Sequence, residues 1–301
     1  MWKKIRGIVT QGLLATVATQ CGGSDGKIFA TGGDDDATVT ISVTDAPVDS
    51  ATAVVVRFSG IELTPTSGDK VTITLNPVQE VDLLSLSDGA TTALVTNQTI
   101  DSGTYSSIRF ILDATSSSQD ASHVDLSDGS SFPLIIPNNG DDGLTITKSF
   151  TVAEDGRLNL VADFDLRKSI APRTGSSFSF RPSVRVVDSS QSGAIAGSIV
   201  SSLVPDNCAP FVYVFSNSGT TPDDMDSSSN TGPVVSVPVK LNVSSGTYSY
   251  RASYLDTGTY TVAYTCNGST DNPDSNEALV FSRKGDATVT ANQTLILDFI
   301  S

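Results

Sequence analysis

The sequence predicts an all-β protein with two antiparallel domains, each a β-sandwich or barrel-like fold. Short runs of alternating apolar and β-branched residues recur along the 301-residue chain, and turn signals rich in Gly, Asp, Asn and Ser separate them. Helix-period patterns are nearly absent, and no helix of crossover length lies between the runs. Most strands are therefore expected to pair antiparallel, and the length is typical of two domains.

Residues 37–63 carry the strongest strand signal. Thr38–Thr44 alternates apolar and polar residues, Asp45–Pro47 interrupts the run, and a second run continues to Leu63. We expect a hairpin of two strands here, with an apolar face that later strands must cover.

The first domain is predicted to span residues 37–188 and the second residues 193–301. The later strands of the first domain are expected at 69–75, 79–86, 105–114, 122–127, 130–137, 144–152, 157–166 and 178–188. Those of the second domain are expected at 193–200, 211–216, 234–241, 246–265, 278–283 and 288–299.

Residues 1–20 have the features of an export signal peptide. A basic start, "MWKKIR", precedes a short and moderately apolar stretch that ends in small residues. The sequence "VATQCGG" then resembles a bacterial lipobox, which implies lipidation of Cys21. Ala18 and Gln20 depart from the usual lipobox residues, so ordinary cleavage nearby is the alternative. Residues 21–36, rich in Gly and Asp, are expected to form a flexible tether.

The localisation that follows is export, either as an outer-membrane lipoprotein or as a periplasmic or cell-surface protein. Gly22 and Gly23 carry no Asp-type signal for inner-membrane retention. The formal net charge of −15 gives a surface that repels nucleic acid and anionic membranes. The expected partners are a membrane, through the lipid anchor, and a glycan or surface-protein ligand.

Several motifs in the first domain resemble a known family. "SVTDAPVDSATAVVVRFSGIEL", "VDLLSL", "SGTYSSIRFIL", "LVADFDLRKSI" and "FRPSVRVVD" occur in this order. Together they resemble the bacterial envelope family of domain of unknown function 4382. The resemblance implies a secreted or lipid-anchored bacterial protein and no established activity.

The second domain is similar to the prealbumin-like modules found in carboxypeptidases and collagen-adhesin stalks. The similarity rests on "GTYSYRASYLDTGTYTVAYT", in which Gly258 is expected to make a turn while Tyr248 and Tyr260 fill the sandwich core. The resemblance implies a supporting or spacing role.

Cys208 and Cys266 are predicted to form a disulfide. One precedes the strand at 211–216 and the other follows the strand that ends at 265, so antiparallel pairing of these strands would bring the two residues together. Export favours this pairing over free thiols.

No catalytic motif is recognised, and the protein is predicted not to be an enzyme. His123, the sole histidine, is expected in an exposed loop. Asp163 and Asp165 could form the carboxylate pair of a glycan hydrolase, but surface ion pairs with Arg167, Arg181 or Arg185 explain them as well.

No cofactor is expected. The alternative is that the protein binds calcium. Asp224, Asp226, Ser228 and Asn230 alternate as in the first half of a calcium loop, although Ser229 stands where that loop requires glycine. The oxygen-rich segments 138–143 and 269–277 are similar candidates, although a solvated turn explains each of them as well. The predicted function is a surface binding or structural module of the cell envelope. A carboxylate-dependent glycan hydrolase and a calcium-stabilised, adhesin-like stalk are the alternatives.

Overall fold

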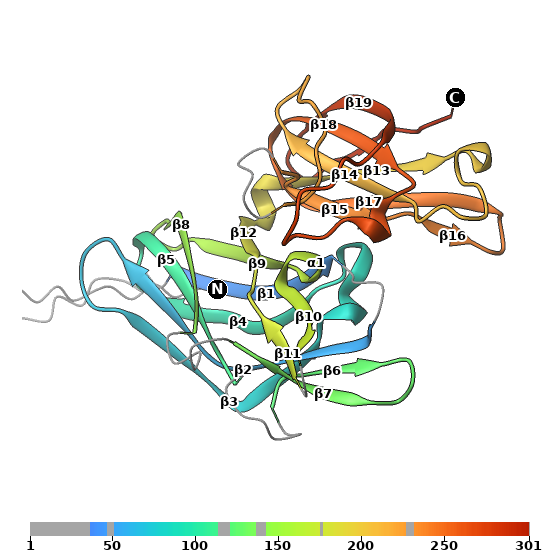
Figure 1. Cartoon of the computed structure of the whole chain (residues 1–301). Coiled ribbons are helices and arrows are strands. Elements are labelled where there is room, and N and C mark those ends of the chain that lie inside the picture. Colours follow the sequence, from blue (N-terminus) through green and yellow to red (C-terminus); the bar gives the residue numbers. More distant parts are fainter. Residues whose placement is uncertain are drawn as a thin grey trace, which may run out of the picture. The chain divides into compact units, whose positions relative to one another are not determined.

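The computed structural model describes residues 37–46, 51–113, 121–136, 143–174, 177–226 and 232–300. These residues form four β-sheets, and their short helical segments are the turn α1 and four 3-10 turns (Figure 1). The all-β prediction is confirmed. The predicted signal peptide, Cys21 and the tether lie outside the described residues. Both sandwiches belong to one compact unit, Asp34–Ser301.

The first sandwich packs a four-stranded sheet against a larger one. In order across the sheet, the strands of the smaller one are β12 (Val184–Asp188), β9 (Arg157–Asp165), β1 (Ala37–Ala46) and β4 (Thr92–Ile100). The larger sheet runs in the order β10 (Ile170–Thr174), β11 (Ser177–Phe180), β7 (Ser131–Ile135), β6 (His123–Leu126), β2 (Ala51–Pro65), β5 (Gly103–Leu112) and β8 (Leu144–Val152), with β3 (Val71–Asp82) also paired to β2.

Alternating side chains of both sheets fill the core between them. Val39 and Ile41 of β1 are fully buried in the same cluster as Val56 and Phe58 of β2. The Phe58 ring also makes an edge contact with Phe164 of β9 at a centroid distance of 6.0 Å. The strand periodicity of the sequence thus correctly identifies the inward-facing residues.

The predicted hairpin of residues 37–63 is wrong. Strand β1 pairs with β4 and β9, while β2 lies in the opposite sheet and pairs with β3, β5 and β6. The β1–β9 pairing is parallel, which the sequence also did not indicate. Two strands with one apolar face each can bury those faces against one another across a sandwich, so a hairpin is not required.

Further elements differ from the prediction. Strand β10 was not expected, and the expected strand 178–188 is divided between β11 and β12, which lie in different sheets. Strand β4 was not anticipated, because its apolar residues are few and Asn97 adopts a positive φ of 48° within it. The expected strand 79–86 ends at Asp82, whose side chain accepts a hydrogen bond from Leu84 N and thereby caps the 3-10 turn η1 (Leu83–Gly89).

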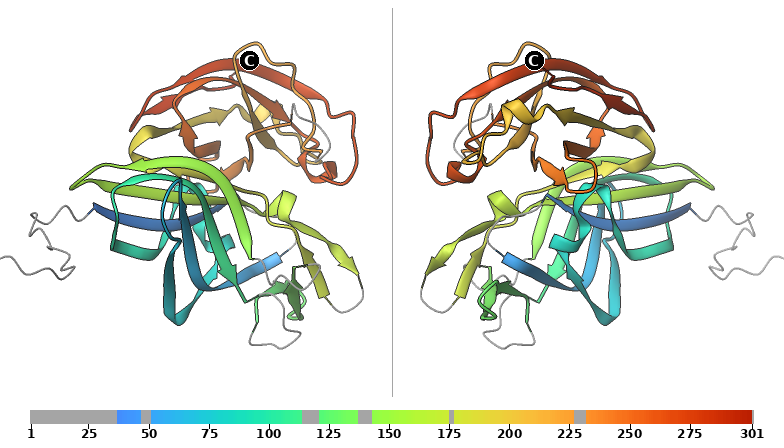
Figure 2. Two further views of the ribbon diagram at one scale, coloured as in Figure 1. Left: turned by 90° about the vertical axis from the view of Figure 1, so that its left-hand side faces the viewer. Right: turned by 90° about the vertical axis from the view of Figure 1, so that its right-hand side faces the viewer.

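The second sandwich consists of two four-stranded sheets, coloured yellow to red in Figure 2. One has the order β16 (Lys240–Asn242), β17 (Thr247–Asp256), β13 (Ser192–Ile199) and β20 (Thr294–Ile296). The other has the order β15 (Val235–Pro238), β14 (Phe211–Ser216), β18 (Gly258–Thr265) and β19 (Phe281–Val289). Short 3-10 turns lie at η3 (Ser189–Gln191), η4 (Ser201–Leu203) and η5 (Gly268–Thr270).

Tyrosines occupy the second core as expected, though not all at the predicted positions. Tyr260 is buried and its hydroxyl donates to Asp256 O at 2.7 Å, whereas Tyr248 is only partly buried at the margin of the core. Tyr250 instead lies inside and stacks on Phe299.

Strand β14 is buried on both faces. Val212 and Val214 point into the sandwich core, while Phe211, Tyr213 and Phe215 form a separate outer cluster with Met225. A sheet face covered in this way needs chain packed over it, and residues 222–226 and 268–281 contribute Met225, Leu279 and Phe281.

Cys208 and Cys266 form a disulfide with their Cα atoms 4.6 Å apart. The antiparallel pairing of β14 with β18 sets Phe211 opposite Thr265, so the two cysteines lie at the same end of the sheet. Among the described residues, no helix is long and apolar enough to cross a membrane.

Removing the disulfide should destabilise the second sandwich. The bond closes a loop with a sequence separation of 58 residues, and the Cys208→Ala/Cys266→Ala variant is expected to lose about 4 kcal/mol of unfolding free energy. Urea denaturation of the oxidised wild type and the double variant measures this loss. A difference below about 1 kcal/mol would contradict it.

Asp286 should make stability pH-dependent in acid. Its carboxylate accepts hydrogen bonds from Gly219 N at 3.0 Å and Thr261 Oγ1 at 2.9 Å, which lower its pKa below the ordinary value. The folded state therefore gains stability above the unfolded pKa of about 3.9, and this gain is lost as pH falls through the lower folded value.

We accordingly expect Asp286→Asn to be less stable than wild type at pH 7, with a smaller difference at pH 2. Urea denaturation at both pH values measures the difference, and Asp206→Asn, which changes an exposed acid, is the control. A difference independent of pH would contradict the assigned role of Asp286.

Candidate functional site

The most distinctive constellation of polar side chains lies where the two sandwiches meet. The first sandwich contributes α1 (Leu166–Ser169), β12 and η1. The second contributes β14, β15, β17 and the segment that follows β18. Buried charges at such a junction must be paired or fully hydrogen-bonded, so their partners show what the junction does.

A capped turn positions the central arginine. Asp165, at the end of β9, accepts a hydrogen bond from Lys168 N at 3.2 Å and so begins the short helix α1. The Lys168 ammonium lies 3.7 Å from the Asp165 carboxylate and donates to Pro233 O at 2.8 Å. This turn directs Arg167 toward the second sandwich.

Arg167 is 8 % exposed, and its guanidinium is held by the second sandwich on several sides. It donates to Tyr213 Oη at 3.2 Å, to Ser236 Oγ at 3.0 Å and to Gly268 O. It also lies over the Phe211 ring, 4.1 Å from the centroid. Stacking on an aromatic face and several directed donors are the means by which a buried guanidinium is stabilised.

Gly268 permits this contact because it has no side chain. A Cβ atom at this position would lie 2.1 Å from the Phe211 ring, the ring that Arg167 covers. The close approach brings the Gly268 carbonyl to the guanidinium. A larger residue would displace one or the other.

Tyr213 connects the arginine to an acid. Its hydroxyl accepts from Arg167 and donates to Asp271 Oδ2. Burial raises the pKa of Tyr213, and although Arg167 opposes this shift, the nearby Asp271 carboxylate reinforces it. The tyrosine is therefore neutral at physiological pH and serves as a donor in the chain from Arg167 to Asp271.

A second arginine, which is partly buried, lies on β12. Arg185 forms an ion pair with Asp163 of β9 and donates to Ser253 O at 2.9 Å and to Tyr254 O across the junction. Burial raises the pKa of Asp163, while the Arg185 guanidinium opposes that shift. The pair thus cross-links the sandwiches through backbone carbonyls of β17.

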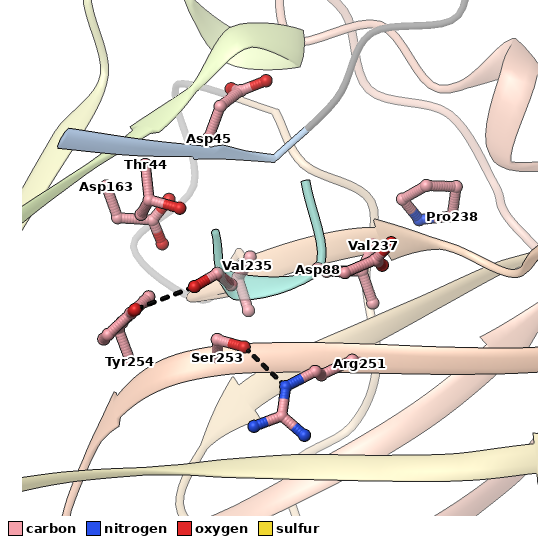
Figure 3. Close-up of a pocket in the computed structure, with 11 residues that line it drawn as sticks. Thr44, Asp45, Asp88, Asp163, Val235, Val237, Pro238, Arg251, Ser253 and Tyr254 are labelled. Atoms are coloured by element: carbon pink, nitrogen blue, oxygen red, sulfur yellow. Dashed lines mark hydrogen bonds between the residues drawn. The ribbon is translucent and has the colours of Figure 1, made fainter. Parts of the chain in front are cut away.

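The turn η1 completes the junction. Lys240 of β16 lies 2.7 Å from the Asp88 carboxylate, and Tyr254 Oη donates to Gly89 O at 2.9 Å. A cavity of about 20 Å³ remains beside these contacts, lined by residues of β1, β9, η1, β15 and β17 (Figure 3). That volume has room for about one water molecule.

The acids considered for hydrolysis are structural. Asp163 and Asp165 are 7 % and 9 % exposed and are engaged by Arg185 and by Lys168. Of the three arginines predicted to pair with these acids, Arg185 does pair with Asp163, although that carboxylate is buried. Arg167 is buried against the second sandwich, and Arg181 pairs with Asp274 at 3.4 Å instead. The carboxylates are buried because the second sandwich covers this face of β9.

His123 begins strand β6 and is half-buried, which corrects its predicted place in an exposed loop. Its Nδ1 lies 3.0 Å from Ala121 O, and its Nε2 lies 3.9 Å from the Asp125 carboxylate. These contacts do not include a serine nucleophile.

The calcium candidates are only partly described. Asp224 and Asp226 are buried, while Ser228 and Asn230 lie outside the described residues. Residues 138–142 also lie outside the described residues. One carboxylate oxygen each of Asp224, Asp271 and Glu277 lie within 4.8 Å of one another. Two segments that the sequence offered separately, 224–226 and 269–277, are thus brought together.

Sequence reasoning missed Arg167, Tyr213 and Gly268 as junction residues. The fully apolar run of β14, "FVYVF", is the signal that could have found them. A strand of a two-layer sandwich normally alternates, so a continuous run indicates that a second face is covered.

Residues 36–182 match the family model described as Domain of unknown function (DUF4382). The match confirms the resemblance seen in the sequence and covers β1 through β11 of the first sandwich. Arg167, Asp163 and Asp165 lie within the matched residues, while Arg185 follows them. A search of curated proteins finds no match.

Solved structures that align with this chain include the TIE protein of Bacillus anthracis, with 12 % identity and a TM-score of 0.19 over 88 % of this chain and 34 % of that one. The fimbrial anchor protein Mfa2 of Porphyromonas gingivalis aligns with 12 % identity and a TM-score of 0.20 over 83 % of each chain. The major pilin of Streptococcus pyogenes aligns with 12 % identity and a TM-score of 0.18 over 88 % of this chain and 99 % of that one. This chain thus spans about a third of the TIE protein, and TM-scores of this size do not indicate a common fold.

Loss of the central arginine should weaken the junction. Arg167→Met keeps much of the side-chain volume but leaves the buried Ser236 hydroxyl and Gly268 carbonyl without their donor, at an expected cost of about 2–4 kcal/mol. Urea denaturation measures it. Arg181→Met, which removes an exposed ion pair, is the matched control and should cost less than about 0.5 kcal/mol. Equal losses in the two variants would contradict the role assigned to Arg167.

Proposed function

We propose that this chain is an exported, lipid-anchored protein of the cell envelope that acts as a non-enzymatic surface module. Cys21 would hold it to a membrane, and residues 22–36 would serve as the spacer. The two sandwiches would then present a ligand-binding or structural surface, with a glycan or another surface protein as the partner.

The proposal rests mainly on the charged residues at the junction, which bind one another or the second sandwich and are not available for catalysis. Asp163, Asp165, Arg167 and Arg185 are all engaged in contacts that hold α1, β9 and β12 against the second sandwich. Carboxylates fixed by Lys and Arg partners do not supply the free acid and base that glycoside hydrolysis needs.

The space beside these carboxylates supports the same reading. Two cavities border them, with volumes of about 20 Å³ and about 100 Å³. Sites for organic ligands are usually about 300 Å³ or larger. A sugar ring bound for hydrolysis would require the two sandwiches to separate.

The anchor can be tested by intact mass and cell fractionation. The full chain is expressed in a Gram-negative host, as wild type and as Cys21→Ala. We expect the wild type to carry a diacylglycerol mass on Cys21 and to fractionate with membranes, because a thioether-linked lipid supplies the membrane affinity. Cys21→Ala should remove both.

A wild-type protein that is cleaved elsewhere and recovered in the soluble fraction would contradict the anchored module. Cys208→Ala is the control, since it removes a cysteine outside the signal region and should leave the lipid mass unchanged.

A further inference from the structure

Two loop segments of the second sandwich meet over the outer face of β14. Residues 222–226 lead away from β14, and residues 268–277 follow β18. Met225 N donates to Asp271 Oδ1 at 3.2 Å, and Glu277 N donates to an oxygen of Asp224. Reciprocal backbone contacts therefore fix acidic side chains of one segment beside those of the other.

Three carboxylates converge at this meeting point. One oxygen each from Asp224, Asp271 and Glu277 lie within 4.8 Å of one another. Opposite oxygen ligands of a calcium ion are separated by up to about 4.6–5.2 Å, since each Ca–O distance is about 2.3–2.6 Å. The spacing of the three oxygens is compatible with a common ion.

An unsatisfied oxygen distinguishes this cluster from an ordinary acidic turn. Asp224 is fully buried, and its Oδ1 has no hydrogen-bond partner among the described residues. Leaving a buried carboxylate oxygen without a partner is costly, so this oxygen is free to bind an ion or a water molecule.

No described Lys or Arg forms an ion pair with Asp224, Asp271 or Glu277. The nearest guanidinium, that of Arg167, reaches Asp271 only through the Tyr213 hydroxyl. Arg181 pairs with Asp274 instead. Positive charge that could balance three close carboxylates is therefore not supplied by the described side chains.

We propose that Asp224, Asp271 and Glu277 bind a calcium ion that joins segments 222–226 and 268–277. The ligands are all carboxylates, which suit a hard cation, and His123 lies in the other sandwich, so the imidazole and thiolate ligands typical of zinc are missing from the set. Calcium also accepts the irregular geometry of two loops and fills its remaining positions with water.

The site is connected to the junction. Asp271 accepts a hydrogen bond from Tyr213, and Tyr213 accepts one from Arg167. A bound ion would therefore fix Asp271, the residue at the end of the hydrogen-bond series that begins at Arg167. Calcium is expected to stabilise the whole two-sandwich unit because it binds the folded state alone.

The test is titration of the full chain, after removal of metal with EGTA, by calorimetry and thermal unfolding with CaCl₂ and separately with MgCl₂. We expect one calcium per chain and a Tm several degrees higher at saturating calcium. Asp224→Asn and Glu277→Gln should each weaken calcium binding roughly tenfold or more. Asp274→Asn, an exposed acid in the same loop, should leave the affinity within about twofold.

The Tm of the metal-free variants shows whether Asp224 is a calcium ligand or an acid that stabilises the fold by itself. Without calcium, Asp224→Asn should have a Tm equal to or above that of wild type, because the substitution removes a buried and uncompensated charge. No calcium-dependent shift in the wild type would overturn the proposal. So would equal weakening by Asp274→Asn, or magnesium binding as tight as calcium binding. None of these outcomes depends on lipidation of Cys21.

Discussion

A buried guanidinium is the constraint on which the arrangement of the two sandwiches depends. Arg167 carries its charge into an aromatic and polar surface of the second sandwich, where it must be fully satisfied. This requirement accounts for the capped turn that presents Arg167 and for the tyrosine that connects Arg167 to Asp271. It also accounts for the glycine at 268, since the lack of a side chain there lets the Gly268 carbonyl reach the guanidinium. Each of these features is local, and together they fix one sandwich on the other.

The same constraint explains why an acidic chain has few acids free for chemistry near its centre. Asp163 and Asp165 lie on a strand whose outer face is covered, so each has acquired a basic partner. The remaining close carboxylates, Asp224, Asp271 and Glu277, lie in loops that cover β14. The charges at the junction therefore hold the two sandwiches together.

Most strand positions followed from the sequence, because alternation of apolar residues reports burial directly. The pairing of the strands did not follow. The apolar face expected in residues 37–63 is buried, as Val39 and Val56 show. Alternation is the same, however, whether a strand's neighbour lies beside it or across the core, and β1 and β2 lie in opposite sheets. The cysteine pairing was more tractable, since it required only that β14 and β18 be antiparallel neighbours.

The junction was beyond sequence reasoning for a related reason. The sequence around Asp165 and Arg167 looks like the charged end of any exposed strand. The two residues are buried only because they pack on a surface that lies more than 40 residues away along the chain. Likewise, the segments 224–226 and 269–277 each resembled a solvated turn. Only their packing over β14 brings three carboxylates together.

The contacts at the junction imply that the two sandwiches unfold as one cooperative unit, which scanning calorimetry of the wild-type chain can measure. We expect a single thermal transition whose calorimetric and van't Hoff enthalpies agree. Two resolved transitions, or a calorimetric enthalpy about twice the van't Hoff value, would show that the sandwiches unfold independently and would contradict the claim.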